Sequence, residues 1–177
     1  MKLDSQGWFS GVRRLTSPNH DERPPRTPVS LLVIHNISLP PDQFGGPGID
    51  QLFTNTLPHD THPYYDQLRG LRVSSHFLIR RTGEIVQYVS CQRRAWHAGV
   101  STWQGRERCN DFSIGIELEG SDFIPYTELQ YRRLSYLSRR LKSAFPIRDI
   151  AGHADIAPQR KTDPGPSFDW QRYLNSL

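Results

Sequence analysis

The sequence predicts a single α/β domain over residues 1–177, with a central mixed β-sheet flanked by helices. Its length of 177 residues suits one domain with one sizeable core. Short apolar runs of strand length alternate with a segment of helical periodicity, which is the pattern of a layered α/β fold. The chain is 36% hydrophobic and 23% charged, values that are ordinary for a globular protein and argue against a disordered one.

Residues 1–28 are expected to form an N-terminal arm packed on this domain. The arm lacks a continuous apolar run long enough for a signal peptide. No window of the chain approaches the ~20 apolar residues of a membrane-spanning helix. We therefore expect a cytoplasmic protein with no membrane partner. Cys91 and Cys109 fit a reducing compartment, as free and partly buried thiols rather than a disulfide.

The chain is modestly basic, with a formal net charge of +4. Its arginines occur in pairs scattered along the sequence, whereas nucleic-acid-binding proteins usually gather basic residues into a stripe or a known module. We therefore expect no nucleic-acid partner. The same charge suits small anionic substrates, so charge alone does not decide the function.

The first predicted strand is the continuous apolar run 31–34 (LLVI), typical of a strand that is buried on both faces. It ends at the polar residues His35 and Asn36. Segment 49–53 predicts a short helix, and segment 54–70 predicts a polar, proline-containing loop.

A hairpin and a further strand are expected next. The β-rich runs 75–81 and 84–89 are separated by the pair Thr82-Gly83, which favours a hairpin turn. Segment 112–118 (FSIGIEL) alternates as a strand does. This alternation places Ile114 and Ile116 on one face of the strand and Ser113, Gly115 and Glu117 on the other.

The clearest helix starts at Thr127, which forms a capping box with Gln130. Apolar residues follow at helical spacing, with arginines on the other sides, as in a helix that packs one face on a sheet. Pro146 ends this helix, and residues 147–151 predict another strand. A short C-terminal helix is expected from about Phe168.

Two predicted strands deliver a histidine at their carboxyl ends: His35 in LLVIHN and His153 in IRDIAGH. Ten residues later, Asp163 lies in the motif TDPGP, whose prolines stiffen the loop. Zinc accepts imidazole nitrogen and carboxylate oxygen, and catalytic zinc sites use three protein ligands and leave the fourth position to water. If these three residues meet in space, they predict one zinc ion at the strand ends.

Two further residues are candidates for catalysis. Glu117 lies on the strand face opposite the isoleucines, where a carboxylate can take a proton from an activated water. Glu119 lies on the same face, and the pattern alone does not choose between them or exclude an exposed edge-strand glutamate. Lys161, in RKTDPGP, suits a developing oxyanion, although a solvated lysine in a basic loop is the simpler interpretation.

Five motifs resemble a known family, in the same order along the chain: LLVIHNISLPPxxFGG, RVSSHFLIRRTGEIVQYV, RAWHAGVS, GRERCNDFSIGIELEG and GHADIAPxRKTDPGPxFDW. They look like the zinc N-acetylmuramoyl-L-alanine amidases. That family includes cytoplasmic 1,6-anhydro-N-acetylmuramyl-L-alanine amidases, phage amidase lysozymes and peptidoglycan recognition proteins. The resemblance runs from about residue 5 to the C-terminus. It implies a fold of the amidase or peptidoglycan recognition protein type, with a zinc site at the strand ends.

The resemblance also implies roles for individual residues. His35, His153 and Asp163 match the family's zinc ligands, and an aspartate at the third position is similar to the cytoplasmic branch, since other branches usually carry cysteine there. The first glutamate of IGIELEG matches the family's catalytic acid/base, which selects Glu117 over Glu119. Lys161 matches the residue that stabilises the oxyanion.

The implied reaction is hydrolysis of the amide between (1,6-anhydro-)N-acetylmuramic acid and the L-alanine of the stem peptide, in cytoplasmic muropeptide recycling. The implied partner is an anhydromuropeptide substrate, and the protein is expected to be a monomer. Arginines suit the carboxylates of the stem peptide, and a tryptophan face suits a sugar ring. By resemblance, the substrate groove is lined by Asn36, Arg72, Trp96, His97, Arg108 and Ala154.

The other histidines receive simpler interpretations. His20, His59 and His62 are expected in loops, and His76, inside a hairpin strand, is expected to be structural or to support a ligand. Three alternative functions stay open at this point. They are a peptidoglycan-binding module without catalysis, a nucleic-acid-binding protein, and an amidase that acts on intact cell wall.

Overall fold

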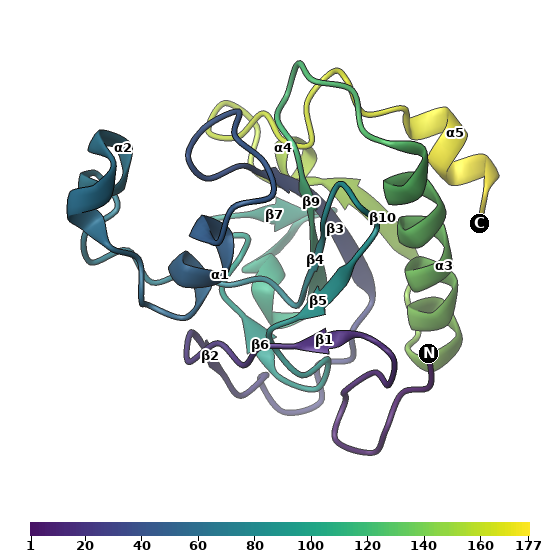
Figure 1. Ribbon diagram of the computed structural model, residues 1–177. Coiled ribbons are helices and arrows are strands. Elements are labelled where there is room, and N and C mark those ends of the chain that lie inside the picture. Colours follow the sequence, from purple (N-terminus) through teal and green to yellow (C-terminus); the bar gives the residue numbers. More distant parts are fainter.

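A six-stranded sheet in the order β1-β5-β4-β9-β3-β10 organises the structure, a computed structural model that describes residues 1–177 (Figure 1). Strands β4, β9, β3 and β10 are mutually parallel, β5 is antiparallel to β4, and β1 is parallel to β5. The predicted central mixed sheet flanked by helices is confirmed. The strands are β1 Arg13–Arg14, β3 Leu31–Ile37, β4 Phe77–Ile79, β5 Ile85–Gln87, β9 Ser113–Glu119 and β10 Asp149–Gly152.

Strand β3 is buried on both faces, as its continuous apolar run predicts. Leu32 and Ile34 belong to the largest hydrophobic cluster, beneath helix α3. Leu31 and Val33 point the other way, into a smaller cluster that includes Ala151 and Ile156 of the neighbouring segment. The strand continues through His35 and Asn36 to Ile37, so these polar residues belong to the strand itself.

Helices α3 (Glu128–Ala144) and α5 (Trp170–Asn175) lie side by side on one face of the sheet (Figure 1). The predicted capping box is present: the Thr127 hydroxyl accepts from the Gln130 amide N–H, and the Gln130 side chain accepts from the Thr127 N–H. The hydroxyls of Ser138 and Tyr173 join the two helices through a 2.6 Å hydrogen bond. Helix α3 ends before Pro146, as expected.

The opposite side carries α1 (Gly48–Phe53), whose apolar residues pack with Leu78 and Val86 of the hairpin. The prediction of a plain loop over 54–70 is wrong, because this segment contains η1 (His59–Thr61) and α2 (Pro63–Asp66). A proline at the first position favours a helical turn, and the His62 side chain accepts the Tyr64 amide N–H at the start of α2.

The predicted hairpin is confirmed as β4 and β5, with Leu78 opposite Val86. Its turn spans residues 81–83 and is thus one residue wider than the Thr82-Gly83 pair, because the Arg80 amide N–H donates to the Glu84 carbonyl at 2.9 Å. Strand β10 starts two residues later than predicted, because the chain first makes a tight turn at Pro146, where the Ile147 amide donates to the Phe145 carbonyl. His153 consequently lies in the short helix α4 (His153–Ile156).

The N-terminal arm makes extensive contacts with the rest of the chain. Strand β1 pairs with β5, and β2 (His20–Asp21) pairs with β6 (Arg94–Ala95). His20 therefore lies in a strand, and its loop prediction is wrong. Phe9 enters the largest hydrophobic cluster. The remaining elements are the hairpin β7 (Thr102–Trp103) and β8 (Arg106–Glu107), and η2 (Cys109–Asp111).

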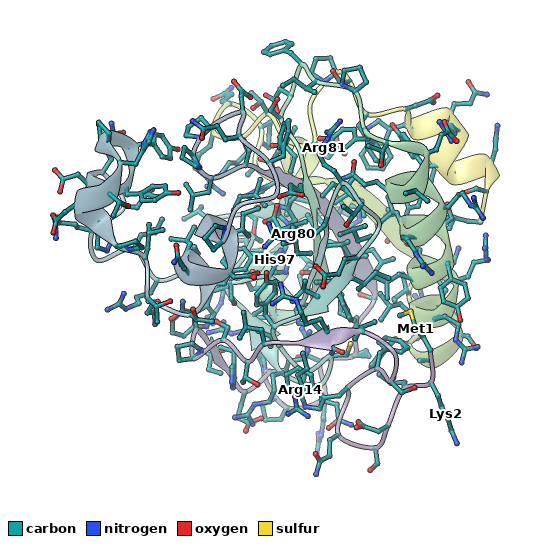
Figure 2. The ribbon with its side chains drawn as sticks, in the orientation of Figure 1. Met1, Lys2, Arg14, Arg80, Arg81 and His97 are labelled. Atoms are coloured by element: carbon teal, nitrogen blue, oxygen red, sulfur yellow. The ribbon has the colours of Figure 1, made fainter.

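Two further predictions are tested by burial and hydropathy. Cys91 and Cys109 are free thiols, as expected, but both are fully rather than partly buried. None of the helices has the length and apolar character needed to cross a bilayer. In Figure 2, Arg80 and His97 lie within the body of the protein, whereas the Lys2 side chain extends from its surface.

Candidate active site

Three candidate residues meet where the parallel strands β3, β9 and β10 end. In the register of the sheet His35 lies opposite Glu117, and Gly152 lies opposite Ile34, so that His153 follows directly beside His35. Neighbouring residues in register project from the same face of a sheet. Polar groups at the carboxyl ends of parallel strands therefore gather at one edge, which is where α/β proteins usually bind ligands.

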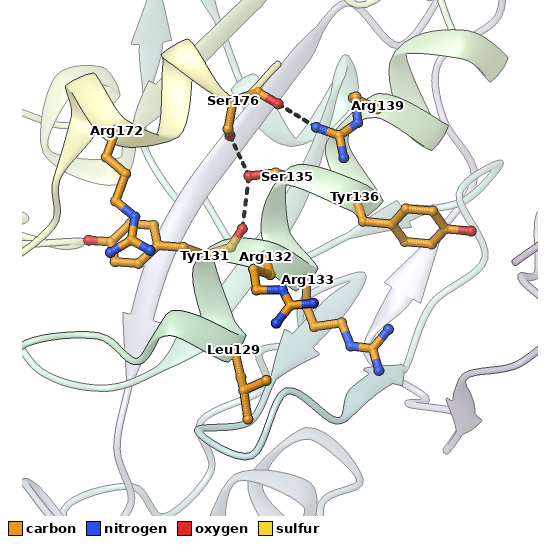
Figure 3. A pocket seen from close by; sticks show the side chains of 9 residues that line it. All are labelled: Leu129, Tyr131, Arg132, Arg133, Ser135, Tyr136, Arg139, Arg172 and Ser176. Atoms are coloured by element: carbon orange, nitrogen blue, oxygen red, sulfur yellow. Dashed lines mark hydrogen bonds between the residues drawn. The ribbon is translucent and has the colours of Figure 1, made fainter.

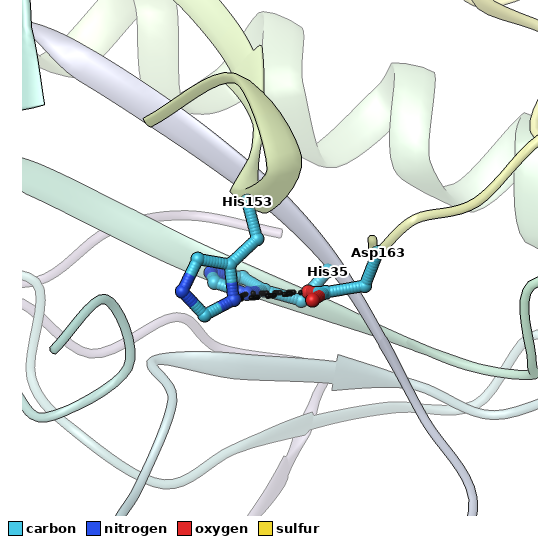
Figure 4. Close-up of side chains that lie close together, drawn as sticks. All are labelled: His35, His153 and Asp163. Carbon is cyan, nitrogen blue, oxygen red and sulfur yellow. Dashed lines mark hydrogen bonds and ion pairs between the residues drawn. The ribbon is translucent and has the colours of Figure 1, made fainter. Parts of the chain in front are cut away.

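The side chains of His35, His153 and Asp163 converge on one point (Figure 4). The Nδ1 atoms of the two histidines are 3.0 Å apart. The Asp163 Oδ2 atom lies 3.0 Å from Nδ1 of His35 and 3.1 Å from Nδ1 of His153. Three donor atoms of this kind, each about 3 Å from the other two, suit a dication bonded at about 2.0–2.1 Å to each.

The loop that carries Asp163 is held in place on both sides of this residue. The backbone carbonyl of Asp163 accepts a hydrogen bond from the amide N–H of Ala154 at 2.9 Å. The next carbonyl, of Pro164, accepts from the Asn36 amide at 3.1 Å and from the Tyr126 hydroxyl at 2.7 Å. Gly165 follows with φ of +79°, and a Cβ there would lie 2.3 Å from Asp122. Only glycine therefore fits this turn.

The protonation states of the three residues suit a metal. Nε2 of His153 lies 3.1 Å from the Ala98 carbonyl, which can only accept, so the neutral ring carries its proton there and leaves Nδ1 bare. Burial lowers the pKa of His35 to about 4, so this ring is neutral near pH 7. Burial alone would raise the pKa of Asp163, but hydrogen bonds from the two histidines outweigh it and lower that pKa. The cluster therefore offers two imidazole nitrogens and one carboxylate.

Glu117 points to the same region but makes different contacts. Its side chain is buried, and its Oε2 atom has no hydrogen-bond partner. Burial raises the pKa of Glu117 well above its ordinary value, the charge of Asp163 raises it further, and the ammonium of Lys161 opposes both. A buried carboxyl group with a raised pKa is suited to accepting and returning a proton near neutral pH.

Glu119, the other candidate, is fully engaged elsewhere. Its Oε1 accepts from Arg80 at 2.9 Å and from the Gly45 amide at 2.7 Å, and its Oε2 accepts the Arg81 amide at 3.0 Å. Neither glutamate lies on an exposed edge, because β9 is a central strand.

A cleft of about 770 Å³ opens over the cluster. Of the residues predicted by resemblance to contact substrate, Asn36, Arg72, Trp96 and His97 line it, together with Lys161. Arg108 and Ala154 do not: Arg108 forms an ion pair with Asp111, and Ala154 supports the Asp163 loop through its backbone. Both amide hydrogens of Asn36 are donated within the protein, to Asp122 and Pro164, which leaves its carbonyl oxygen for a ligand.

Several lining residues are absent from the sequence-based candidates, notably Tyr64, Leu71, Phe123 and Arg160. Phe123 is 80% exposed, and Leu71 is 43% exposed. A phenylalanine in a polar turn (SDFIP) was an available signal for Phe123. Tyr64 lies in the short helix α2, and Leu71 and Arg160 lie in loops; none of these positions carries a comparable pattern.

Two further buried histidines lie near the cluster. His97 has Nδ1 at 2.9 Å from Nε2 of His35 and Nε2 at 3.1 Å from the Ser113 hydroxyl. Burial lowers the pKa of His97 well below its ordinary value. His76 accepts the Gly115 amide at 3.1 Å and lies 3.1 Å from the Arg93 carbonyl, so it contacts no candidate ligand atom and is structural, as expected.

A second hollow, of about 500 Å³, lies between α3 and α5 (Figure 3). These helices cover the Ile114 and Ile116 face of the sheet, so the hollow is on the other side of the sheet from Glu117. No histidine, cysteine or carboxylate lines it, and it therefore lacks the groups of a metal or acid/base centre. Two of its four arginines are already paired, Arg139 with the Ser176 carbonyl and Arg172 with Glu128.

Comparison with known proteins points to one family. The profile of the family described as N-acetylmuramoyl-L-alanine amidase matches residues 25–166. The chain is 59% identical over 173 residues to the 1,6-anhydro-N-acetylmuramyl-L-alanine amidase AmpD of Escherichia coli K12, covering 97% of this chain and 94% of that protein.

Solved structures agree with this comparison. The crystal structure of a selenomethionine derivative of AmpD superimposes with a TM-score of 0.97 at 57% identity, covering 100% of this chain and 99% of the other. The E. coli amidase AmiD, solved with anhydro-N-acetylmuramic acid-L-Ala-D-γ-Glu-L-Lys, gives a TM-score of 0.60 at 31% identity. The match covers 98% of this chain and 62% of that one.

Proposed function

This chain belongs to the N-acetylmuramoyl-L-alanine amidase family and is an enzyme of that class, and on this premise we propose that it hydrolyses anhydromuropeptides with one bound zinc ion. The bond cleaved joins (1,6-anhydro-)N-acetylmuramic acid to the L-alanine of the stem peptide. The observation that carries the proposal is the convergence of His35, His153 and Asp163 beside an unpartnered Glu117, at the base of a cleft.

The donor set favours zinc. Two imidazole nitrogens and one carboxylate oxygen are typical of catalytic zinc sites that keep an open position. When bound, zinc supplies a Lewis acid that polarises the scissile carbonyl and brings the pKa of its water to about 7. The Ala98 carbonyl holds the His153 proton on Nε2, which leaves the lone pair of Nδ1 free to bind the metal.

Proton transfer is assigned to Glu117. Its carboxylate takes the proton of the attacking water and then delivers it to the departing amine nitrogen of L-alanine, so the group returns to its starting state. Burial and the unpartnered Oε2 leave that atom free for this role. Lys161, at the rim of the same cleft, places a positive charge where the carbonyl oxygen becomes anionic.

Substrate orientation is assigned to the cleft walls. Arg72 suits a carboxylate of the stem peptide, and Trp96 offers a flat apolar face to the sugar. Trp96 and Arg72 reach the cleft from neighbouring segments, which are joined by the hydrogen bond from the Ser74 amide to the Trp96 carbonyl. Arg108 and Ala154 are retained as contacts by family resemblance only, since neither lines the cleft.

Three further features complete the proposal. Residues 1–177 act as one amidase domain, with the arm 1–28 joined to it through β1 and β2. The enzyme works as a monomer. It acts in the cytoplasm, on fragments released during peptidoglycan recycling.

The reaction is tested by mass spectrometry of a soluble anhydromuropeptide incubated with zinc-loaded and with chelated protein. Release of the free stem peptide by the zinc-loaded protein, but not by the chelated protein, would establish both the bond cleaved and the cofactor. No cleavage by the zinc-loaded protein would contradict the proposed substrate.

The metal assignment is tested separately with Asp163→Ala. We expect this variant to be purified with little or no zinc and to release no stem peptide, because two histidines alone hold zinc weakly. Metal content is measured by atomic emission after dialysis against zinc-free buffer. Undiminished zinc in the variant would remove Asp163 from the ligand set.

A further inference from the structure

The ring of His97 lies at the Nε2 side of His35, whereas His153 and Asp163 lie at its Nδ1 side. It is 9% exposed, its plane is almost perpendicular to that of His35 (87°), and the ring centroids are 5.0 Å apart. Both ring nitrogens already have partners inside the protein, Nε2 of His35 at 2.9 Å and the hydroxyl of Ser113 at 3.1 Å. This geometry leaves His97 little capacity to hydrogen-bond a substrate.

Ser113, His97 and His35 form a series of hydrogen bonds, and the donor and acceptor of each bond can be assigned from its Ser113 end. The Ser113 hydroxyl lies 2.6 Å from the Cys109 carbonyl, which has no proton to give, so the single hydroxyl proton is donated there. The Ser113 oxygen must then accept from Nε2 of His97. A neutral His97 has its second nitrogen, Nδ1, bare.

The same logic continues to the ligand. Bare Nδ1 of His97 accepts a hydrogen bond, and its donor is the Nε2–H group of His35 at 2.9 Å. Neutral His35 then carries its only proton on Nε2, and its Nδ1 lone pair is directed at His153 and Asp163. Starting from one backbone carbonyl, every proton in the chain has a single allowed position.

We propose that His97 and Ser113 are positioning residues that fix His35 in the tautomer able to bind a metal. Both proposed histidine ligands are thus held with the proton on Nε2 and a bare Nδ1, but by different contacts. The Ala98 carbonyl fixes His153 directly, whereas His35 is fixed through an imidazole and a hydroxyl. The inference rests on the proposed ligand role of His35 and replaces the substrate-contact role that family resemblance implied for His97.

Gly115 provides the space for this arrangement. A Cβ on Gly115 would lie 2.6 Å from Cγ and 2.7 Å from Nδ1 of His97. Any side chain there must push the ring away from His35. Ser113 and Gly115 are alternate residues of β9 on the same face as Glu117, so one strand supplies the hydroxyl, the gap and the catalytic carboxylate.

The direct test is the tautomer of His35 in the metal-free protein, read from long-range ¹H–¹⁵N NMR spectra of the imidazole rings. We expect wild-type His35 to be protonated on Nε2 alone. In His97→Leu and in Ser113→Ala we expect a mixture of both tautomers. Because no metal is present, this readout does not depend on catalysis.

Zinc affinity gives the second readout, measured by competition with a chromophoric chelator. Loss of a partner behind a metal-bound histidine typically weakens binding roughly 10- to 100-fold. We expect a loss of this size in His97→Leu and in Gly115→Ala. His97→Asn keeps an amide oxygen near the position of Nδ1 and should bind zinc within a few-fold of the wild type.

His76→Leu is the matched control, because its ring lies 5.8 Å from that of His97 in the same buried layer but contacts no ligand. It should lower the thermal unfolding midpoint while leaving the His35 tautomer unchanged. If His76→Leu and His97→Leu changed the His35 tautomer equally, the effect would come from loss of a buried ring in general, and the inference would be overturned. So would an unmixed Nε2 tautomer in both His97→Leu and Ser113→Ala. Absence of zinc binding by the wild type would instead contradict the proposed function.

Discussion

Strand β9 carries two buried glutamates on one face, two residues apart, and they have opposite surroundings. Every carboxylate oxygen of Glu119 accepts a hydrogen bond, from Arg80 or from the Gly45 and Arg81 amides. Glu117 is also buried, but its Oε2 has no hydrogen-bond partner. Buried polar groups are normally satisfied, and leaving one without a partner is costly. The comparison separates a carboxylate that stabilises the fold from one kept available for chemistry.

The cations near the two glutamates differ in the same way. Arg80 is buried between Glu119 and Asp50, with nitrogen–oxygen distances of 2.9 and 3.1 Å. Lys161 is exposed at the rim of the cleft and forms no ion pair. A guanidinium locked between carboxylates can do little besides hold them, whereas a free ammonium can respond to charge that develops on a substrate.

The comparison predicts its largest effect for Glu117→Gln. This variant keeps the shape of the side chain but cannot take or return a proton, so we expect turnover to fall by roughly 10³-fold. Zinc content should be unchanged, since Glu117 is not among the three converging donors. Stem-peptide release and metal content are measured on the same preparation. Turnover near the wild-type value would remove Glu117 from the mechanism.

Glu119→Gln is the matched change on the same face. It leaves Arg80 buried with one carboxylate partner fewer, and breaking a buried ion pair typically costs about 3 kcal/mol of unfolding free energy. Turnover per folded molecule should stay close to that of the wild type. Urea denaturation gives the stability, and activity at low temperature gives the turnover. A Glu119→Gln variant that is stable but inactive would contradict the assignment of Glu119 to stability and of Glu117 to catalysis.

Much of this contrast was accessible from the sequence. Alternation in FSIGIEL placed Glu117 opposite Ile114 and Ile116, and the strand ends predicted where His35 and His153 lie, because both depend on local periodicity. Choosing between Glu117 and Glu119 required family resemblance. The structure supplies the physical reason: Glu119 is paired with the buried Arg80, which follows β4 in the hairpin and lies 39 residues away in the sequence.

Other parts of the site could not be predicted because they depend on contacts between distant segments. The partners Ser113 and His97 are 16 residues apart, and His97 and His35 are 62 apart. No spacing rule connects them. Family resemblance assigned His97 to the substrate, and only its burial and its two hydrogen bonds suggest another role. The helical turns within 54–70 were missed because short proline-capped turns lack the periodicity on which helix prediction depends.

Lys161→Met tests the exposed cation and should have a smaller effect than Glu117→Gln. Loss of one group that stabilises an oxyanion typically lowers turnover about 10²-fold. Because Lys161 forms no ion pair, the free energy of unfolding should change little, unlike that of any variant at Arg80. Steady-state kinetics on the anhydromuropeptide measure the first quantity and urea denaturation the second. An unchanged kcat would indicate that Lys161 is a solvated lysine with no role in catalysis.

The smallest predicted effect is a gain in stability. Since burial raises the pKa of Glu117, the folded metal-free protein binds a proton more tightly at this site than the unfolded chain does. The stability contributed by Glu117 is therefore complete below the unfolded pKa, near 4.3, and is lost as the pH rises through the folded value.

Glu117→Gln removes this titration, so the variant should match the wild type near pH 4 and be more stable near pH 7. We expect the gain to grow as the pH rises from 4 to 7, because each tenfold difference in proton affinity between the folded and unfolded states corresponds to about 1.4 kcal/mol. Urea denaturation of both metal-free proteins at the two pH values measures it. Glu119→Gln should show no such gain at neutral pH, because the Glu119 carboxylate has Arg80 and two amides as partners. If both variants gained equally, the two glutamates would not differ in the way their contacts indicate.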